Sequence, residues 1–140
     1  MDTTIVLGIT VMILILIILL FAAVYLGGKK IDSSKKPDIL NKIEELRLAI
    51  TSLEGSSRRD AVVKLDNLLS KSLQLKYNNS LTCGDNLKKA KGTFSKKEYN
   101  SLWDAHKTRN NIVHDDYEID EKEAEEVYHI YKSSIIKILK

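Results

Sequence analysis

The sequence predicts an all-α protein, with one N-terminal transmembrane helix followed by a small four- to five-helix bundle. Three observations predict it. The chain of 140 residues carries no charged residue between Thr3 and Leu26, and it contains only one proline and six glycines. After Pro37 its apolar residues recur at spacings of three and four, which is typical of helices. So short a chain excludes a multi-pass transporter and an enzyme with two lobes.

The apolar segment is predicted to be a transmembrane signal anchor that covers residues 1–27. Twenty-four helical residues span about 36 Å, enough to cross a hydrocarbon core of about 30 Å. Membrane lipid is therefore the expected partner of residues 3–26. A cleaved signal peptide fits less well, because the preceding Met-Asp-Thr-Thr is not basic and the apolar stretch is long.

A basic juxtamembrane linker is predicted over residues 28–37, where Gly, Ser and Lys favour solvent. Only Asp2 is charged ahead of the anchor, whereas four lysines follow it: Lys29, Lys30, Lys35 and Lys36. By the positive-inside rule, the domain that follows lies in the cytoplasm. The predicted location is thus the cell (inner) membrane, single-pass, with the C-terminal domain cytoplasmic. A single cysteine, Cys83, agrees with a reducing compartment.

Residues 38–140 are predicted to form the cytoplasmic helical bundle. A first helix ends at Gly55-Ser56, a second runs from about Arg58 to Tyr77, and a short third covers about 85–91. The last two begin at the capping motifs Ser95-Lys-Lys-Glu98 and Asp120-Glu-Lys-Glu123. The residues expected to point inward are Ile39, Ile43, Leu46, Ile50 and Leu53, then Val62, Leu65, Leu69 and Leu73, then Leu87 and Ala90, then Tyr99, Leu102, Trp103 and His106, and finally Ala124, Val127, Tyr128, Tyr131, Ile135 and Ile138.

Residues that suit a chemical step are concentrated in WDAHKTRNNIVHDDYEID, residues 103–120. Arg109, Asn110 and His114 bring a guanidinium, an amide and an imidazole within about one and a half helical turns. Cleavage of a phosphodiester needs a group that moves protons near neutral pH, as histidine does, and a fixed set of donors for the phosphoryl oxygens, as arginine supplies. The sequence has no phosphate loop, dinucleotide fingerprint or nucleophile elbow.

The segment from Arg109 to His114, RNNIVH, resembles the R-x(4–6)-H motif of the HEPN superfamily, including the polar residue that follows the arginine. The acidic loop after it and the helix beginning EKEAEEVYHIY are similar to the way these domains end. The resemblance implies a small helical domain over residues 38–140, paired as a homodimer. Many members of the superfamily are metal-independent endoribonucleases, so the resemblance also implies that activity.

The resemblance also implies a role for each residue of the motif. His114 would move the proton for attack of a ribose 2′-hydroxyl on the adjacent phosphate, Arg109 would stabilise the charge on the phosphorane, and Asn110 would orient one of them. No cofactor and no metal would be needed, which agrees with the absence of a His, Cys and Asp pattern at zinc or di-metal spacing.

An RNA partner requires a basic surface, and the candidate nucleic-acid-binding residues are lysines in the middle of the chain: Lys88, Lys89, Lys91, Lys96 and Lys97. Against this, eight carboxylates between Asp115 and Glu126 repel a polyanion beside the motif. The alternative function is therefore a non-catalytic helical interaction module that recruits a protein partner to the membrane.

Structural roles compete with the catalytic ones. His114 also suits the carboxyl end of a helix dipole, and Arg109 also suits an ion pair with Asp104, with Asp116 or with acids of the last helix. His106 is expected to be packed or half-exposed, and His129 to lie on the surface. The aromatic residues at helical spacing are expected in the core more than in base stacking, and the lysines are equally consistent with a solvated face.

Overall fold

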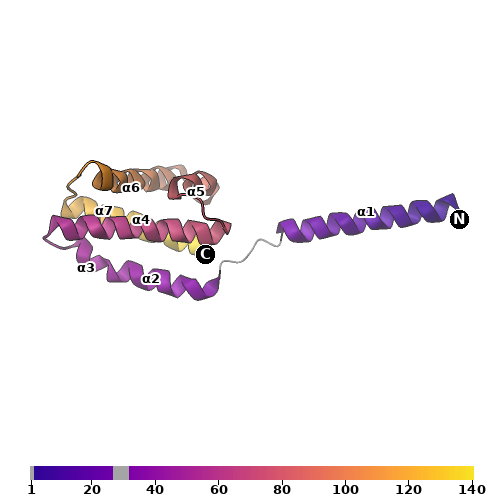
Figure 1. Ribbon diagram of the computed structural model, residues 1–140, viewed down its shortest axis with the longest axis horizontal. Coiled ribbons are helices and arrows are strands. Elements are labelled where there is room, and N and C mark those ends of the chain that lie inside the picture. The colour runs from indigo at the N-terminus through magenta and orange to yellow at the C-terminus, as the bar shows by residue number, and fades with distance from the viewer. Residues whose placement is uncertain (1, 27–31) are drawn as a thin grey trace. The chain divides into compact units, whose positions relative to one another are not determined.

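The computed structural model describes residues 2–26 and 32–140, and within these ranges the chain is helical with no β-strand. The predicted all-α class is confirmed. The chain divides near residue 30 into two compact units, each taken by itself below (Figure 1). Residues 28–31 of the predicted linker lie outside the described residues, whereas its second half forms η1 (Ser33–Lys35) and the start of α2 (Lys36–Glu45).

The first unit is the helix α1 (Thr3–Leu26). Its segment Thr3–Tyr25 is long and apolar enough to cross a membrane, as predicted, and none of it is buried inside the protein. An apolar helix in the core of a soluble domain would be covered by neighbouring elements. The exposure of α1 therefore agrees with a helix whose side chains are covered by lipid.

The second unit is a helical bundle built around α4 (Gly55–Tyr77). The other elements are α2, α3 (Arg47–Ile50), α5 (Cys83–Lys89), η2 (Ala90–Thr93), α6 (Lys96–His114) and α7 (Glu121–Leu139). Helix α4 contacts α7 most extensively and also touches α2, α3, α5 and α6, and α6 packs on α7 as well. Figure 1 shows α4 and α7 in the middle layer, with α5 and α6 on one side and α2 and α3 on the other.

One continuous apolar core fills the space between these helices. All the predicted inward residues of α4, α5, η2 and α7 are buried, and so is Leu102 of α6. Each fully buried Leu or Ile contributes about 1.5–3 kcal/mol relative to an exposed position. The largest fully buried side chains are Ile39, Ile43, Ile50, Leu65, Leu69, Leu73, Leu87, Leu102, Ile119, Tyr131, Ile135 and Ile138.

The prediction for the first helix of the bundle is wrong at its C-terminal end. The helix breaks after Glu45 and resumes as α3, and Leu53, expected inside, is 92% exposed. The reason is Arg58, whose Nη1 donates to the carbonyl of Ser52 at 2.6 Å and whose Nε donates to the carbonyl of Ile119 at 3.0 Å. These bonds hold the segment before α4 as a turn, so Leu53 does not continue the apolar face of the preceding helix. Gly55, expected to end a helix, instead begins α4.

The predicted capping box at Ser95 is confirmed, and so is the aspartate cap at Asp120, although the Glu123 carboxylate accepts from the Tyr117 hydroxyl and not from the Asp120 amide. The hydroxyl of Ser95 accepts a hydrogen bond from the amide of Glu98 at 3.3 Å, while the Glu98 carboxylate accepts the amide of Ser95 at 2.7 Å. The carboxylate of Asp120 accepts the amide of Glu123 at 2.8 Å. Because these caps satisfy amides that have no partner within the helix, they fix where α6 and α7 begin.

Candidate functional site

The predicted motif occupies the C-terminal half of α6. Arg109 is partly buried, and its Nη1 donates a hydrogen bond of 2.9 Å to the side-chain oxygen of Asn110. His114 is the last residue of α6, and its side chain is exposed with no hydrogen bond to the part of the chain that the structure describes. Five residues separate Arg109 from His114, about 140° around the helix, so the two side chains leave α6 in different directions. The structure thus brings Arg109 and Asn110 together but leaves His114 apart.

The ion pair of Arg109 differs from those that the sequence suggested. Its Nε lies 3.5 Å from Oδ2 of Asp66 on α4, and not beside Asp104, Asp116 or an acid of α7. The pair joins residues 43 positions apart, because the fold packs α6 against α4. Sequence spacing on α6 alone carries no information about such a partner.

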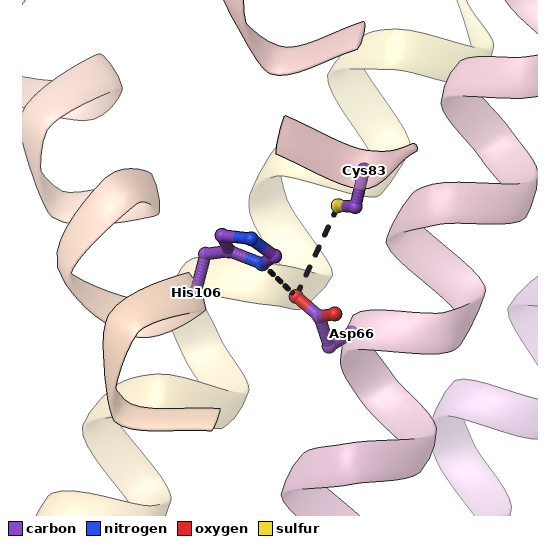
Figure 2. A group of neighbouring side chains, drawn as sticks. All are labelled: Asp66, Cys83 and His106. Carbon is purple, nitrogen blue, oxygen red and sulfur yellow. Dashed lines mark hydrogen bonds and ion pairs between the residues drawn. The ribbon is translucent and has the colours of Figure 1, made fainter. Parts of the chain in front are cut away.

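Asp66 is the centre of a buried polar group that the sequence analysis missed (Figure 2). It is 2% exposed, and its Oδ1 lies 2.7 Å from Nδ1 of His106 and accepts a 2.9 Å hydrogen bond from the hydroxyl of Tyr131. The thiol of Cys83 approaches the same oxygen at 4.0 Å. We call Asp66, Cys83, His106, Arg109 and Tyr131 the Asp66 cluster; its members come from α4, α5, α6 and α7.

A signal for Asp66 is present in the sequence. It lies four residues after Val62, three before Leu69 and seven before Leu73, all of them fully buried on α4. A carboxylate on the apolar face of a helix must find cationic or hydrogen-bonding partners, because burial of an unpaired charge is costly. That position marks Asp66 as unusual, but it does not identify which residues will satisfy it.

Burial sets the protonation of two members of the Asp66 cluster. Burial, and then the negative charge of Asp66, raise the pKa of the Cys83 thiol well above its ordinary value. The same two causes, in the same order, raise the pKa of the Tyr131 phenol. Both groups therefore stay protonated and act as donors to Asp66 at neutral pH. A protonated, buried thiol is a poor nucleophile, so Cys83 does not supply one.

The Asp66 cluster borders an open pocket of about 380 Å³ between α4, α5 and α6. His106 forms part of its wall, with a side chain that is 12% exposed. The Nε2 atom of His106 faces Gly84, where an added Cβ would lie 3.9 Å away. Gly84 belongs to the first turn of α5, which begins earlier than expected because Thr82 caps it. The lining residues are Asp66, Asn67, Ser70, Thr82, Cys83, Gly84, His106, Arg109 and Asn110.

Asp66, Cys83 and His106 are also ligand types that bind Zn²⁺, and their ligand atoms lie within 4.8 Å of one another. Two features fit a metal poorly. The 2.7 Å separation of the His106 nitrogen and the Asp66 oxygen is shorter than the roughly 3.3 Å between two ligands of a tetrahedral zinc. The guanidinium of Arg109 already neutralises the carboxylate. The donor set fits a hydrogen-bonded network better than a metal centre.

The five candidate nucleic-acid-binding lysines are all exposed. Lys88 lies 3.7 Å from the carboxylate of Asp85, while Lys91 and Lys96 line a groove of about 480 Å³ together with Phe94 and Tyr99. These lysines gather around η2 and the start of α6. The structure therefore places them near one another, but toward the end of α6 opposite His114.

The geometry of α6 relates these lysines to the motif. Lys96 and His114 are the first and last residues of the helix, 18 positions and about 27 Å apart along its axis. Eighteen residues make five full turns, so the two residues lie on the same face of α6. An extended polyanion lying along that face would reach both.

The remaining histidine and aromatic residues follow the expectations. His129 is exposed, His106 is partly buried, and Tyr131 is in the core. Trp103 is partly buried and packs edge-on against Tyr99, with ring centroids 6.3 Å apart, and against His106 at 5.7 Å. This packing helps to hold the imidazole of His106 in place.

Comparison with known protein families, with curated proteins and with solved structures finds no match to this chain. Its function is therefore argued from its own residues.

Proposed function

We propose that this chain is a membrane-anchored, metal-independent endoribonuclease that resembles the HEPN superfamily and acts as a dimer. The observation that carries the proposal is the position of Arg109. Its guanidinium is held at an open polar pocket by Asp66 and Asn110, with a histidine in the same wall. An oriented guanidinium beside an imidazole is suited to a phosphodiester, whose cleavage develops negative charge on the phosphoryl oxygens.

In this proposal, His114 works from a second copy of the chain. Within one chain it faces away from Arg109, and its exposed side chain is free to meet the pocket of a partner. A ribose 2′-hydroxyl attacks the adjacent phosphate, His114 moves one of the two protons of this reaction, Arg109 stabilises the developing charge, and Asn110 orients the guanidinium. No metal takes part.

The charge distribution bears on the substrate. Carboxylates crowd the segment after His114, but Lys96 at the other end of α6 shares a face with His114. A single strand of RNA that follows this face gains a phosphate contact from Lys96 before it reaches His114. The expected substrate is therefore single-stranded RNA and not a duplex.

The proposal includes a location in the cell (inner) membrane through α1, with the bundle in the cytoplasm. The support is the lysine cluster that follows the anchor, including Lys29 and Lys30, opposite the single acid Asp2. Protease added to sealed inside-out membrane vesicles should digest the bundle, whereas right-side-out vesicles should protect it. Protection in the inside-out vesicles alone would reverse the orientation.

The nuclease proposal is tested with the full chain in detergent, a labelled single-stranded RNA and a chelator. Cleavage is expected to persist in the chelator and to fall at least about 100-fold in His114→Ala and in Arg109→Ala. His129→Ala is the matched control, because His129 is an exposed histidine on α7 away from the pocket. Equal cleavage in all variants, or none in the wild type, would exclude the proposal.

A second candidate is the non-catalytic interaction module. The observation that favours it is a pair of exposed leucines, Leu48 and Leu53, at 83% and 92% exposure. Arg58 bonds to both Ser52 and Ile119, so these leucines lie at the end of the bundle that also carries the acidic loop. Apolar side chains beside acids suit a protein partner. This function predicts no RNA cleavage by the wild type and retained partner binding in His114→Ala.

A further inference from the structure

We infer that Asp66 and His106 form a proton-transfer pair at the Arg109 pocket, and that His106 is the base that removes the proton of the ribose 2′-hydroxyl. The inference rests on the proposed ribonuclease function and deepens it. Cleavage of a phosphodiester by its own 2′-hydroxyl moves two protons, one from the attacking oxygen and one to the leaving oxygen. His114 supplies a group for only one of them.

The geometry of His106 is that of an oriented base. Its Nδ1 lies 2.7 Å from Oδ1 of the buried Asp66, and a carboxylate can only accept, so Nδ1 carries the hydrogen. The lone pair then resides on Nε2. That atom has no hydrogen-bond partner among the described residues, and it faces the side of the pocket where Gly84 leaves space. Asp66 therefore fixes the tautomer that a base requires.

The surroundings of His106 support proton transfer. The ionisable groups around it are Asp66 from α4, the protonated thiol of Cys83 from α5, Arg109 from its own helix and the phenol of Tyr131 from α7, which bonds to the same oxygen of Asp66. Asp66 stabilises the imidazolium that forms when Nε2 accepts a proton. Arg109 is at the same pocket, so the phosphate that it binds is held beside that base.

The step is balanced. Nε2 of His106 takes the proton of the 2′-hydroxyl, the 2′ oxygen forms a bond to phosphorus, and the bond from phosphorus to the 5′ oxygen breaks. The leaving 5′ oxygen takes a proton from His114 of the partner subunit. The products are a 2′,3′-cyclic phosphate and a 5′-hydroxyl, and a later proton exchange with solvent restores both histidines. No oxidant, metal or further reactant is needed.

The test uses His106→Asn in the full chain, because the asparagine nitrogen can keep a donor near Asp66 while Nε2 is lost. We expect the rate of cleavage of a single-stranded oligoribonucleotide to fall at least about 100-fold. The decline of that rate toward acidic pH, which protonation of the base causes in the wild type, should also disappear. His129→Asn is the matched control and should retain the wild-type rate and pH profile.

A second variant covers the case in which His106→Asn does not fold. Gly84→Ala places a methyl group at ordinary contact distance from Nε2 and from the Trp103 ring, at 3.9 and 3.6 Å, without touching Asp66. It should fold normally and slow cleavage several-fold by narrowing access to Nε2. Cleavage by the wild type together with an unchanged rate and pH profile in His106→Asn, or, if that variant does not fold, an unchanged rate in Gly84→Ala, would overturn the inference and leave the proposed function standing. Absence of cleavage in the wild type would overturn both.

Discussion

The hydroxyl of Tyr131 on α7 donates a 2.9 Å hydrogen bond to Oδ1 of Asp66 on α4, across a separation of 65 residues. Both side chains are buried, and the bond links the two helices that share the largest contact in the bundle. His106 and Arg109 bring α6 to the same carboxylate. Asp66 therefore contributes to the stability of the bundle as well as to the proposed site.

Removal of the Asp66 carboxylate should destabilise the bundle strongly. Asp66→Ala removes the ion-pair partner of the Arg109 guanidinium and the acceptor of the Tyr131 hydroxyl, and breaking a buried ion pair in this way costs about 3–5 kcal/mol. Urea unfolding of residues 32–140, which have their own core, measures the loss. The matched control is Asp60→Ala on the same helix, where an exposed pair with Lys64 is worth about 0–1 kcal/mol. Similar losses in the two variants would contradict a central role for Asp66.

Stability should decrease in alkaline solution because of Cys83 and Tyr131. The pKa values of both groups are raised in the folded protein. In the unfolded chain the cysteine thiol ionises near pH 9.0 and the tyrosine phenol near pH 10.0. The folded state then binds more protons, so the contribution is complete below pH 9 and is lost as the pH rises further. Above its unfolded-state pKa each group lowers the free energy of unfolding by about 1.4 kcal/mol per pH unit.

Two substitutions distinguish the contribution of Cys83 to this loss of stability from that of Tyr131. In Cys83→Ser the part of the decrease that begins near pH 9 should be absent, and in Tyr131→Phe the part that begins near pH 10. Urea unfolding at pH 7, 9.5 and 10.5 measures how the free energy of unfolding depends on pH in the wild type and in each variant. If the difference in stability between wild type and each variant stays constant over this range, the two groups are not buried as described.

The Asp66 cluster should not take up zinc. Metal binding would require the Cys83 thiol to lose its proton, and burial opposes this because it raises the pKa of the thiol. A bound Zn²⁺ would also add two positive charges beside Arg109. One equivalent of Zn²⁺, or an excess of chelator, should leave the thermal midpoint of residues 32–140 unchanged within about 1 °C. A rise in the midpoint with Zn²⁺ that disappears in Cys83→Ser would instead establish a metal site.

Patterns local to one helix predicted most of the fold. The apolar spacing of α4 and α7 and the caps at Ser95 and Asp120 give the correct faces and starting points, because these signals depend only on neighbours within a few residues. The prediction for Leu53 is wrong because Arg58 bonds to the carbonyls of Ser52 and Ile119, and Ile119 lies 61 residues from Arg58 along the chain. No local pattern contains that contact.

The candidate site, like the fold, could be predicted from the sequence only in part. The sequence by itself determined that α1 is apolar enough to span a membrane, that the rest is helical, and that Arg109, Asn110 and His114 follow one another on one helix. Only the tertiary structure decided that Arg109 pairs with Asp66, that His106 joins them, and that His114 stays apart. The physical reason is that a buried carboxylate is satisfied by whichever donors the packing of four helices delivers to it. Those donors lie between 17 and 65 residues away along the chain.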